Sequence, residues 1–312
     1  MSLLKYINND SYIYQDSDSI IAIGNFDGFH IGHRALIESM NKIKLDKSAK
    51  SLVFSFCPRP TDVFRNITSK SIFSLNERIE IAERLGVDIL VEYPFSLEFS
   101  YMSGEDFIKN ILAKQFRCKH IVIGADFVFG KDRMWDAKWL SEVGEKFEIG
   151  VTVLSHECVG NEKISSSVIR AHLEKGEVGA ANKLLGHEYF LSGIIKHGNK
   201  RGRDLGFPTM NIEPGADKIL PKNGVYITKT HLQDGSSYPS ITNIGNNITF
   251  EYVTTRAETY IHGFNGSIYE QEAKVVFKEH VRGEVKFSGE AELIKQIGID
   301  LDKMKAYYGG LV

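Results

Sequence analysis

The chain has 312 residues, of which 42% are hydrophobic and 25% are charged, and its formal net charge is −2. This length allows two domains with their own cores, and the composition is that of an ordinary globular protein. Because the sequence has no excess of basic residues, we expect no nucleic-acid partner. It contains no run of about 18 apolar residues, so we expect no membrane-spanning helix. The first ten residues lack the apolar core of a signal peptide. Three widely spaced cysteines form neither a disulfide framework nor a zinc pattern, so we expect a cytoplasmic protein.

A glycine turn separates an apolar run from a helical pattern near the N-terminus. Residues 20–23 predict a buried strand, and apolar side chains recur at helical spacing over residues 36–43. Between them, residues 24–33 read Gly-Asn-Phe-Asp-Gly-Phe-His-Ile-Gly-His. A strand, a glycine turn and a helix start present backbone N–H groups and a helix dipole to a phosphate. We therefore predict a nucleotide site in which His30 and His33 donate hydrogen bonds, although such a pair alone is more often incidental or part of a metal site.

Strands and helices are expected to alternate from residue 19 to about residue 154. We expect further strands at residues 52–56, 87–92, 120–124 and 151–154, and helices at residues 76–85, 104–116 and 135–147. Short apolar strands separated by helices predict a parallel sheet covered on both faces. Such sheets bind ligands at the carboxyl ends of their strands, where Asn25, Cys57 and Asp126 would meet.

Two more helices, at residues 165–175 and 178–185, are expected to close a first domain of residues 1–187. Ser166 and Ser167 stand at the start of the first helix, and Arg170 follows about one turn later. Hydroxyl groups with an arginine suit a phosphate site, and a simple capped helix is the structural alternative.

The pattern changes in the second half, which we take as a second domain of residues 188–312. Short strands are expected at residues 189–195, 224–230, 238–244, 258–262, 272–278 and 284–287, with a helix at residues 291–308. Glycine-, asparagine- and proline-rich turns lie between the strands. This pattern predicts a small antiparallel barrel with a C-terminal helix.

Residues 197–211 form a loop in which glycines alternate with basic residues. Its candidate ligand-binding residues are Gly198, Lys200, Gly202, Arg203, Gly206, Pro208, Thr209 and Asn211. Such a loop can wrap a phosphate tail with its backbone N–H groups, and Thr209 and Asn211 offer oxygen ligands for Mg²⁺. Glycine and lysine alone would favour a solvated basic loop, but the string Gly-Phe-Pro-Thr-x-Asn is more specific.

Several motifs together resemble one family. The second half resembles riboflavin kinases through Gly-Arg-x-Leu-Gly-Phe-Pro-Thr-x-Asn (202–211), Asn-Gly-Val-Tyr (223–226), Asn-Ile-Gly (243–245), Glu-Thr-Tyr-Ile (258–261) and Arg-x-Glu-x-Lys-Phe (282–287). The first half resembles FMN adenylyltransferases through the turn at 24–33, Gly-x-Asp-Phe-x-Phe-Gly (124–130) with Arg133, and Ile-Ser-Ser-Ser-x-Ile-Arg (164–170). Since these motifs follow one another over nearly the whole chain, the sequence resembles the bifunctional riboflavin kinase/FAD synthetase family.

This resemblance implies a Rossmann-like nucleotidyltransferase domain followed by a riboflavin kinase-like barrel, and two successive reactions with ATP. In the kinase half, ATP would phosphorylate riboflavin to FMN. Glu258 would be the base that activates the riboflavin hydroxyl, and Thr209 and Asn211 would hold Mg²⁺. In the first half, His30 and His33 would stabilise the ATP phosphates while FMN is adenylylated to FAD. The remaining implied nucleotide- or flavin-binding residues are Gly24, Asn25, Phe26, Asp126, Ser166, Ser167, Arg170 and Asn243.

Three departures from the family pattern keep an alternative open. Arg59 stands where the family usually has histidine, Cys57 where aspartate is common, and Trp135 where glycine is usual. The alternative is a riboflavin kinase whose first domain is a scaffold with weakened or absent adenylylation. Two others are a non-catalytic flavin- or nucleotide-binding regulator and a nucleotidyltransferase for another phosphate acceptor. The intact kinase residues argue against the regulator, and the attached kinase-like half argues against the other acceptor.

Overall fold

The computed structural model describes residues 4–14, 16–130, 134–155, 158–159, 162–197, 206–248 and 253–310. The chain divides into two compact units, the first formed by Met1–Lys70 and Leu75–Ser166 and the second by Ser71–Ser74 and Ser167–Val312. This grouping differs over residues 167–187 from the domain boundary that we predict from the sequence. Within this segment the Asn182 side chain binds to the second unit: its amide donates to the carbonyl of Phe277 (3.0 Å), and its carbonyl accepts from the N–H of Tyr189 (2.7 Å).

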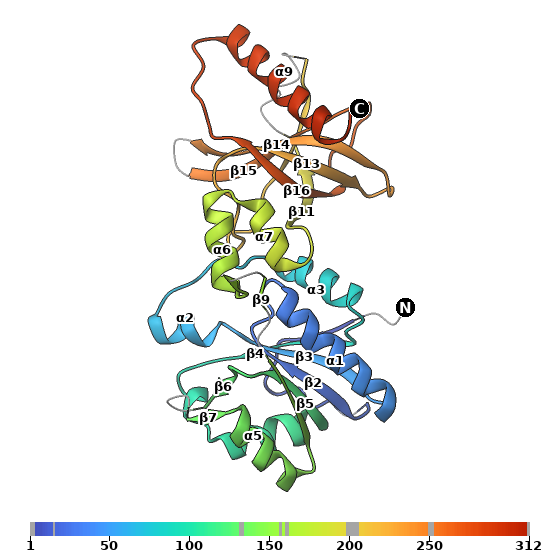
Figure 1. Ribbon diagram of the computed structural model, residues 1–312, viewed down its shortest axis with the longest axis vertical. Coiled ribbons are helices and arrows are strands. Elements are labelled where there is room, and N and C mark those ends of the chain that lie inside the picture. The colour runs from blue at the N-terminus through green and yellow to red at the C-terminus, as the bar shows by residue number, and fades with distance from the viewer. Residues whose placement is uncertain are drawn as a thin grey trace. The chain divides into compact units, whose positions relative to one another are not determined.

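The first unit contains the predicted parallel sheet (Figure 1), with strand order β1-β4-β3-β2-β5-β8. Its strands are β1 (Lys5–Ile7), β2 (Ser19–Ile23), β3 (Lys50–Cys57), β4 (Ile89–Pro94), β5 (Cys118–Gly124) and β8 (Gly150–Leu154). Its helices are α1 (Ile31–Lys47), α2 (Pro60–Arg65), α3 (Leu75–Arg84), η1 (Phe99–Tyr101), α4 (Gly104–Asp106), the π-helical η2 (Phe107–Gln115), α5 (Ala137–Gly144) and η4 (Glu145–Phe147). Two small hairpins complete the unit, β6 (Val128–Phe129) with β7 (Trp135–Asp136) and β9 (Cys158–Val159) with β10 (Glu162–Lys163).

Helices cover the sheet, as the apolar strands predict. All five residues of β2 are buried, because both of its faces are covered. On one face, Ile21 and Phe54 pack in a cluster with residues of η2 and α5, such as Ile108 and Leu140. Helix α1 packs against β2, β3 and β5. The carboxyl ends of β2, β3 and β5 therefore lie side by side, and the turns that follow them share one edge of the sheet.

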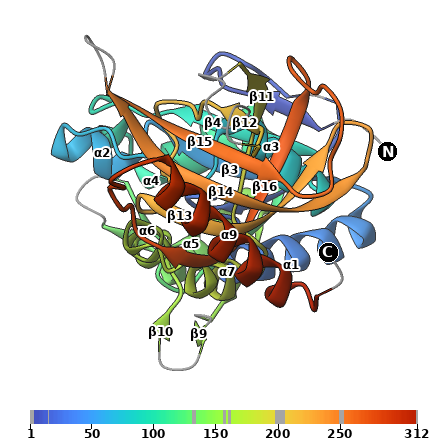
Figure 2. The same cartoon turned by 90° about the horizontal axis from the view of Figure 1, so that it is seen from above.

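The second unit is a closed antiparallel barrel with strand order β11-β12-β15-β14-β13-β16. Its elements are α6 (Ser166–Lys175), α7 (Val178–Leu185), β11 (Phe190–Lys196), β12 (Thr209–Ile212), β13 (Gly224–Leu232), β14 (Ser237–Ile248), β15 (Val253–Ile261), β16 (Glu272–Arg282) and α9 (Glu290–Tyr307). Figure 2 shows α9 lying along the barrel, where Leu301 and Met304 pack with Ile227 of β13. Among the described residues, no helix is long and apolar enough to cross a membrane.

Three local expectations were wrong. Residues 135–136 do not begin a helix, because they pair with β6, and α5 starts only after Asp136, whose carboxylate accepts from the N–H of Trp139 (2.8 Å). Residues 284–287 are not a strand, since β16 ends at Arg282. Conversely, residues 209–212 form a strand inside the segment that the sequence presents as a loop.

Candidate active sites

The histidine turn, which we define as residues 24–33, connects β2 to α1. His30 is the N-cap of α1, and its Nδ1 accepts a hydrogen bond from the backbone N–H of His33 (3.3 Å). Because Nδ1 accepts, a neutral His30 ring carries its proton on Nε2. The first turn of α1 contains no acidic residue. The turn therefore combines a helix N-terminus with an imidazole donor, which is an arrangement suited to a phosphate group.

The two imidazoles form a compact, largely buried pair. Their ring centroids are 3.6 Å apart and nearly parallel at 13°, and each residue is 8% exposed. Phe26 covers the other side of His33, with ring centroids 4.6 Å apart. Burial, and to a smaller extent the adjacent His30, lower the pKa of His33 well below its usual value of 6.5. His33 is therefore neutral at pH 7, and its interaction with a phosphate does not depend on a positive charge.

The lowered pKa of His33 predicts that the first unit loses stability in acid. The unfolded chain takes up a proton on this residue below pH 6.5, whereas the folded chain stays neutral until its lower pKa is reached. Within this window the free energy of unfolding falls by about 1.4 kcal/mol for each pH unit of acidification on account of this group alone. Urea unfolding followed by tryptophan fluorescence measures this effect in the first unit, which holds both Trp135 and Trp139. His33→Asn should flatten the slope below pH 6.5, and an unchanged slope would contradict the prediction.

Arg59 makes a buried ion pair with the histidine turn. Its guanidinium lies 3.0 Å from the carboxylate of Asp27, and the two side chains are 11% and 1% exposed. The same guanidinium contacts the carbonyl of Lys70 (3.4 and 3.5 Å). Arg59, which stands where the family pattern usually has histidine, thus places a permanent cation beside the histidine turn, where it neutralises the buried carboxylate of Asp27.

Removing the Arg59 charge should destabilise the first unit strongly. Breaking a buried ion pair from one side costs about 3–5 kcal/mol, since the remaining charge stays buried, so we expect Arg59→Met to lower the free energy of unfolding by that order. Arg59→Lys should lower the free energy of unfolding by less, because it keeps the positive charge. Adding Asp27→Asn to Arg59→Met should restore part of the loss, and strictly additive effects in denaturant unfolding would show that the pair is not coupled.

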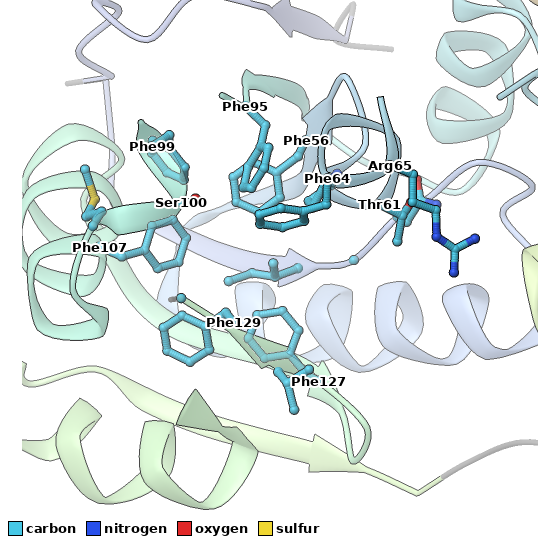
Figure 3. Close-up of a pocket in the computed structure, with 17 residues that line it drawn as sticks. Phe56, Thr61, Phe64, Arg65, Phe95, Phe99, Ser100, Phe107, Phe127 and Phe129 are labelled. Atoms are coloured by element: carbon cyan, nitrogen blue, oxygen red, sulfur yellow. The ribbon is translucent and has the colours of Figure 1, made fainter. Parts of the chain in front are cut away.

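An aromatic cavity of about 430 Å³ adjoins the histidine turn, and Gly24 and Asn25 form part of its wall. Figure 3 shows the rings of Phe56 and Phe64 on one side of this cavity and those of Phe127 and Phe129 on the other. The full lining is Ile23, Gly24, Asn25, Phe56, Pro60, Thr61, Phe64, Arg65, Phe95, Phe99, Ser100, Met102, Phe107, Phe127, Val128, Phe129 and Gly130. A slot between aromatic walls suits a planar, polycyclic ligand.

Trp135 does not contribute to this lining among the described residues. It contacts two residues of the lining instead: its ring centroid is 5.9 Å from that of Phe129, and a Cβ on Gly130 would overlap its indole at 1.8 Å. The indole therefore occupies the space beside a glycine without entering the cavity. Asp126 lies after β5 and pairs with Lys163 (3.5 Å), while Arg133 of the same motif lies outside the described residues.

The predicted serine and arginine residues are divided between the units. Ser166 is the last residue of the first unit, whereas Ser167 and Arg170 belong to the second. All three lie in α6, with Ser167 exposed and Arg170 partly buried. Their participation in the phosphate site of the histidine turn remains a prediction.

A row of polar residues crosses three strands of the barrel. Asn211 of β12 is directly opposite Glu258 of β15, which is in turn opposite Asn243 of β14. Residues opposite one another in antiparallel strands share a face, with Cβ atoms about 5 Å apart. Thr209 lies on the same face, two residues before Asn211. The structure thus brings four of the predicted kinase residues together.

The C-terminal helix covers the next row on this face. Tyr260 and Ile241 lie opposite one another there and pack in the cluster of Leu301 and Met304 from α9. Phe207 belongs to the same cluster, with its ring centroid 5.8 Å from that of Tyr260. The polar row therefore lies beside an apolar wall, and the Gly-Phe-Pro-Thr segment is fixed against it.

Asn211 has the character of a ligand-binding residue. It is 3% exposed, and within the part of the chain that the structure describes its side-chain oxygen has no hydrogen-bond partner. A buried acceptor of this kind suits a cation or a donor group of a ligand. Gly206 adopts a φ of +85°, which favours glycine at the start of the segment. Pro208 lies two residues after Gly206, immediately before β12. The other predicted residues of this loop, Gly198, Lys200, Gly202 and Arg203, lie outside the described residues.

Two groups of residues were missed as site candidates. The phenylalanines of the cavity come from β3, α2, η1, η2, β6 and the intervening loops, and no local spacing connects them. The second is Glu284, which stands in the motif at 282–287 but was not named as a site residue. Its carboxylate accepts a hydrogen bond from the side-chain amide of Asn223 (3.2 Å). A Cβ on Gly245 would lie 2.7 Å from this carboxylate and 3.3 Å from the Asn243 amide, so Glu284 lies near the polar row.

Comparison with known proteins gives consistent matches for both units. The family model described as FAD synthetase matches residues 13–168, and that described as riboflavin kinase matches residues 185–308. Proteins named bifunctional riboflavin kinase/FMN adenylyltransferase are 35% identical in Listeria monocytogenes (96% of this chain, 95% of the relative), 35% in Buchnera aphidicola (99% of each) and 30% in Escherichia coli (99% and 98%). A crystal structure described as a macrolide-efflux protein from Streptococcus pneumoniae has a TM-score of 0.85 and 29% identity, covering 97% of this chain and 99% of that one.

Proposed function

We propose that this chain, which belongs to the bifunctional riboflavin kinase/FMN adenylyltransferase family, phosphorylates riboflavin to FMN and adenylylates FMN to FAD. ATP is the second substrate of both reactions. The observation that carries the adenylylation is that Gly24 and Asn25 belong both to the histidine turn and to the aromatic cavity. A phosphate site and a slot for a flat ring system are thus adjacent in one unit.

In the kinase unit, we assign Glu258 as the general base. Its carboxylate accepts the proton of the 5′-hydroxyl of riboflavin as that oxygen attacks the γ-phosphorus of ATP, and ADP leaves. Asn243, directly opposite Glu258 in the polar row, is placed to orient the substrate. Gly198, Lys200, Gly202, Arg203 and Gly206 would enclose the ATP phosphates.

The donor set of the polar row fits Mg²⁺. This ion keeps several water ligands and needs few protein oxygens, so the orphaned oxygen of Asn211 and the hydroxyl of Thr209 are sufficient as direct ligands. When bound, the ion supplies charge neutralisation on the ATP phosphates.

In the adenylyltransferase unit, the phosphate of FMN is itself the nucleophile. One of its oxygens attacks the α-phosphorus of ATP, the bond to the bridging oxygen breaks, and pyrophosphate leaves. His30 and His33 donate hydrogen bonds to the phosphates as charge develops, together with the N–H groups of α1. Phe26 packs on His33 to hold the pair in place, and Asp126 and Ser166 of the same unit would contribute to the binding of nucleotide and flavin.

Small molecules are the expected partners of this chain. A net charge of −2 gives no reason to expect nucleic acid or a membrane surface as a partner, and we place both reactions in the cytoplasm. The kinase-only alternative rested on Arg59, Cys57 and Trp135. None of these three residues is in the described lining of the aromatic cavity, which supports FMN binding there over the kinase-only alternative.

Chromatographic separation of the flavins tests the proposal. The purified protein is incubated with ATP, Mg²⁺ and either riboflavin or FMN. We expect FMN and then FAD from riboflavin, and FAD directly from FMN. Formation of FMN alone would establish the kinase on an inactive adenylyltransferase scaffold, and absence of both products would support the non-catalytic regulator.

A further inference from the structure

The segment Ser71–Ser74, which we call the strap, lies between α2 and α3 in the sequence but belongs to the second unit. The backbone N–H of Ser71 donates to the carbonyl of Asp217 (2.6 Å), and the N–H of Ile219 donates to the carbonyl of Ser71 (2.8 Å). The chain therefore leaves the first unit after Lys70, is held on the second unit, and returns at Leu75.

A buried lysine anchors the strap. Lys218 is 2% exposed, and its ammonium donates to the carbonyl of Ile72 (3.1 Å). The same ammonium lies 4.8 Å from the ring centroid of Phe73 and 4.7 Å from that of Tyr189. Burying a charge is costly unless specific contacts offset the lost hydration, and here part of the compensation comes from the strap itself. Phe73 is fully buried and also packs on Phe190, with ring centroids 4.9 Å apart.

The chain just before the strap is fixed to α2 in the first unit. The carboxylate of Asp62 accepts from the N–H (3.1 Å) and the hydroxyl (2.8 Å) of Ser69, and Arg59 contacts the carbonyl of Lys70. Pro60, Thr61, Phe64 and Arg65 of α2 line the aromatic cavity. The cavity wall and the strap are thus consecutive parts of one chain segment, each end held by side chains of its own unit.

We propose that Lys218 is a positioning residue for adenylyl transfer: by holding the strap on the riboflavin kinase unit, it fixes the α2 wall of the flavin cavity in the FAD synthetase unit. The sequence matches support this division, because the FAD synthetase model spans the strap and the riboflavin kinase model spans Lys218 and Tyr189. The proposal rests on the assignment of the cavity to FMN. It means that FMN binding in one unit depends on an anchor in the other.

The test compares Lys218→Met with Lys303→Met, which removes an exposed lysine of α9. FMN affinity is measured without ATP by quenching of flavin fluorescence, and FAD formation from FMN gives KM and kcat separately. We expect Lys218→Met to raise the Kd and KM for FMN roughly 3- to 30-fold, which is the range over which such couplings act, with kcat changed less. Riboflavin phosphorylation should be retained in both variants, which shows that the barrel is folded, and Lys303→Met should behave as the unchanged protein.

An unchanged affinity for FMN in Lys218→Met, with phosphorylation retained, would overturn the inference. If that variant also loses phosphorylation, the milder Phe73→Leu is measured in the same way, and loss of both activities there too would show a purely structural role. If the unchanged protein binds FMN but forms no FAD, the proposed function fails while the effect of Lys218 on FMN affinity still decides the inference.

Discussion

Glu258→Gln should abolish the formation of FMN from riboflavin while leaving the formation of FAD from FMN intact. The glutamine amide keeps the size and position of the side chain opposite Asn211 and Asn243 but does not accept the proton of the riboflavin hydroxyl. Loss of a general base lowers the rate about 10²- to 10⁴-fold, so the effect should be in kcat rather than in the KM for riboflavin. Steady-state kinetics of each half-reaction on the same preparation measure both quantities.

Glu272→Gln is the matched control for this variant, because Glu272 is an exposed carboxylate on β16 of the same barrel. It should change neither reaction. A decrease of less than about tenfold in Glu258→Gln would mean that another group takes the proton or that proton transfer does not limit the rate. Glu284, which lies near Asn243, would then be the next residue to change.

His30→Asn should impair FAD formation from FMN by about 10²- to 10³-fold, the usual effect of removing one hydrogen-bond donor to a developing charge. Asparagine is among the best N-cap residues, so its side-chain oxygen should still accept from the N–H of His33 and α1 should remain capped. The imidazole donor and the stacking on His33 are lost. We therefore expect a large effect on catalysis with little change in stability, followed as product formation and as thermal unfolding.

His120→Asn provides the comparison, since His120 lies on β5 of the same unit, outside the histidine turn. It should retain FAD formation, and both variants should phosphorylate riboflavin normally. A parallel loss of stability and of activity in His30→Asn would indicate that this residue serves as a helix cap and not as a phosphate donor.

The sequence predicted the local parts of both sites well. Strand β2, the histidine turn and α1 follow one another in the chain, so apolar spacing and glycine positions were enough to place His30 and His33 at a helix N-terminus. The parallel sheet and the barrel were confirmed, because hydrophobic periodicity distinguishes buried strands from helices.

What was missed depends on contacts between distant segments. The pairing of Asn211 with Glu258 is set by strand register, which no local pattern contains, and β12 was hidden in a glycine-rich loop. The phenylalanines of the cavity meet only after the sheet has formed. Trp135 was expected in a helix, but pairing with β6 outweighed the helical spacing that follows it. The strap was not foreseen at all, since four residues inside one half of the sequence belong to the unit formed by the other half.

The most direct test of two separate sites in one chain is complementation between the Glu258→Gln and His30→Asn variants. Each variant alone, supplied with riboflavin, ATP and Mg²⁺, should form little or no FAD: the first because it lacks FMN, the second because FMN accumulates. An equimolar mixture should form FAD from riboflavin, since FMN made by His30→Asn is adenylylated by Glu258→Gln. FAD formation by Glu258→Gln alone from riboflavin, or failure of the mixture although each variant retains its other half-reaction, would contradict the assignment of the two activities to these two sites.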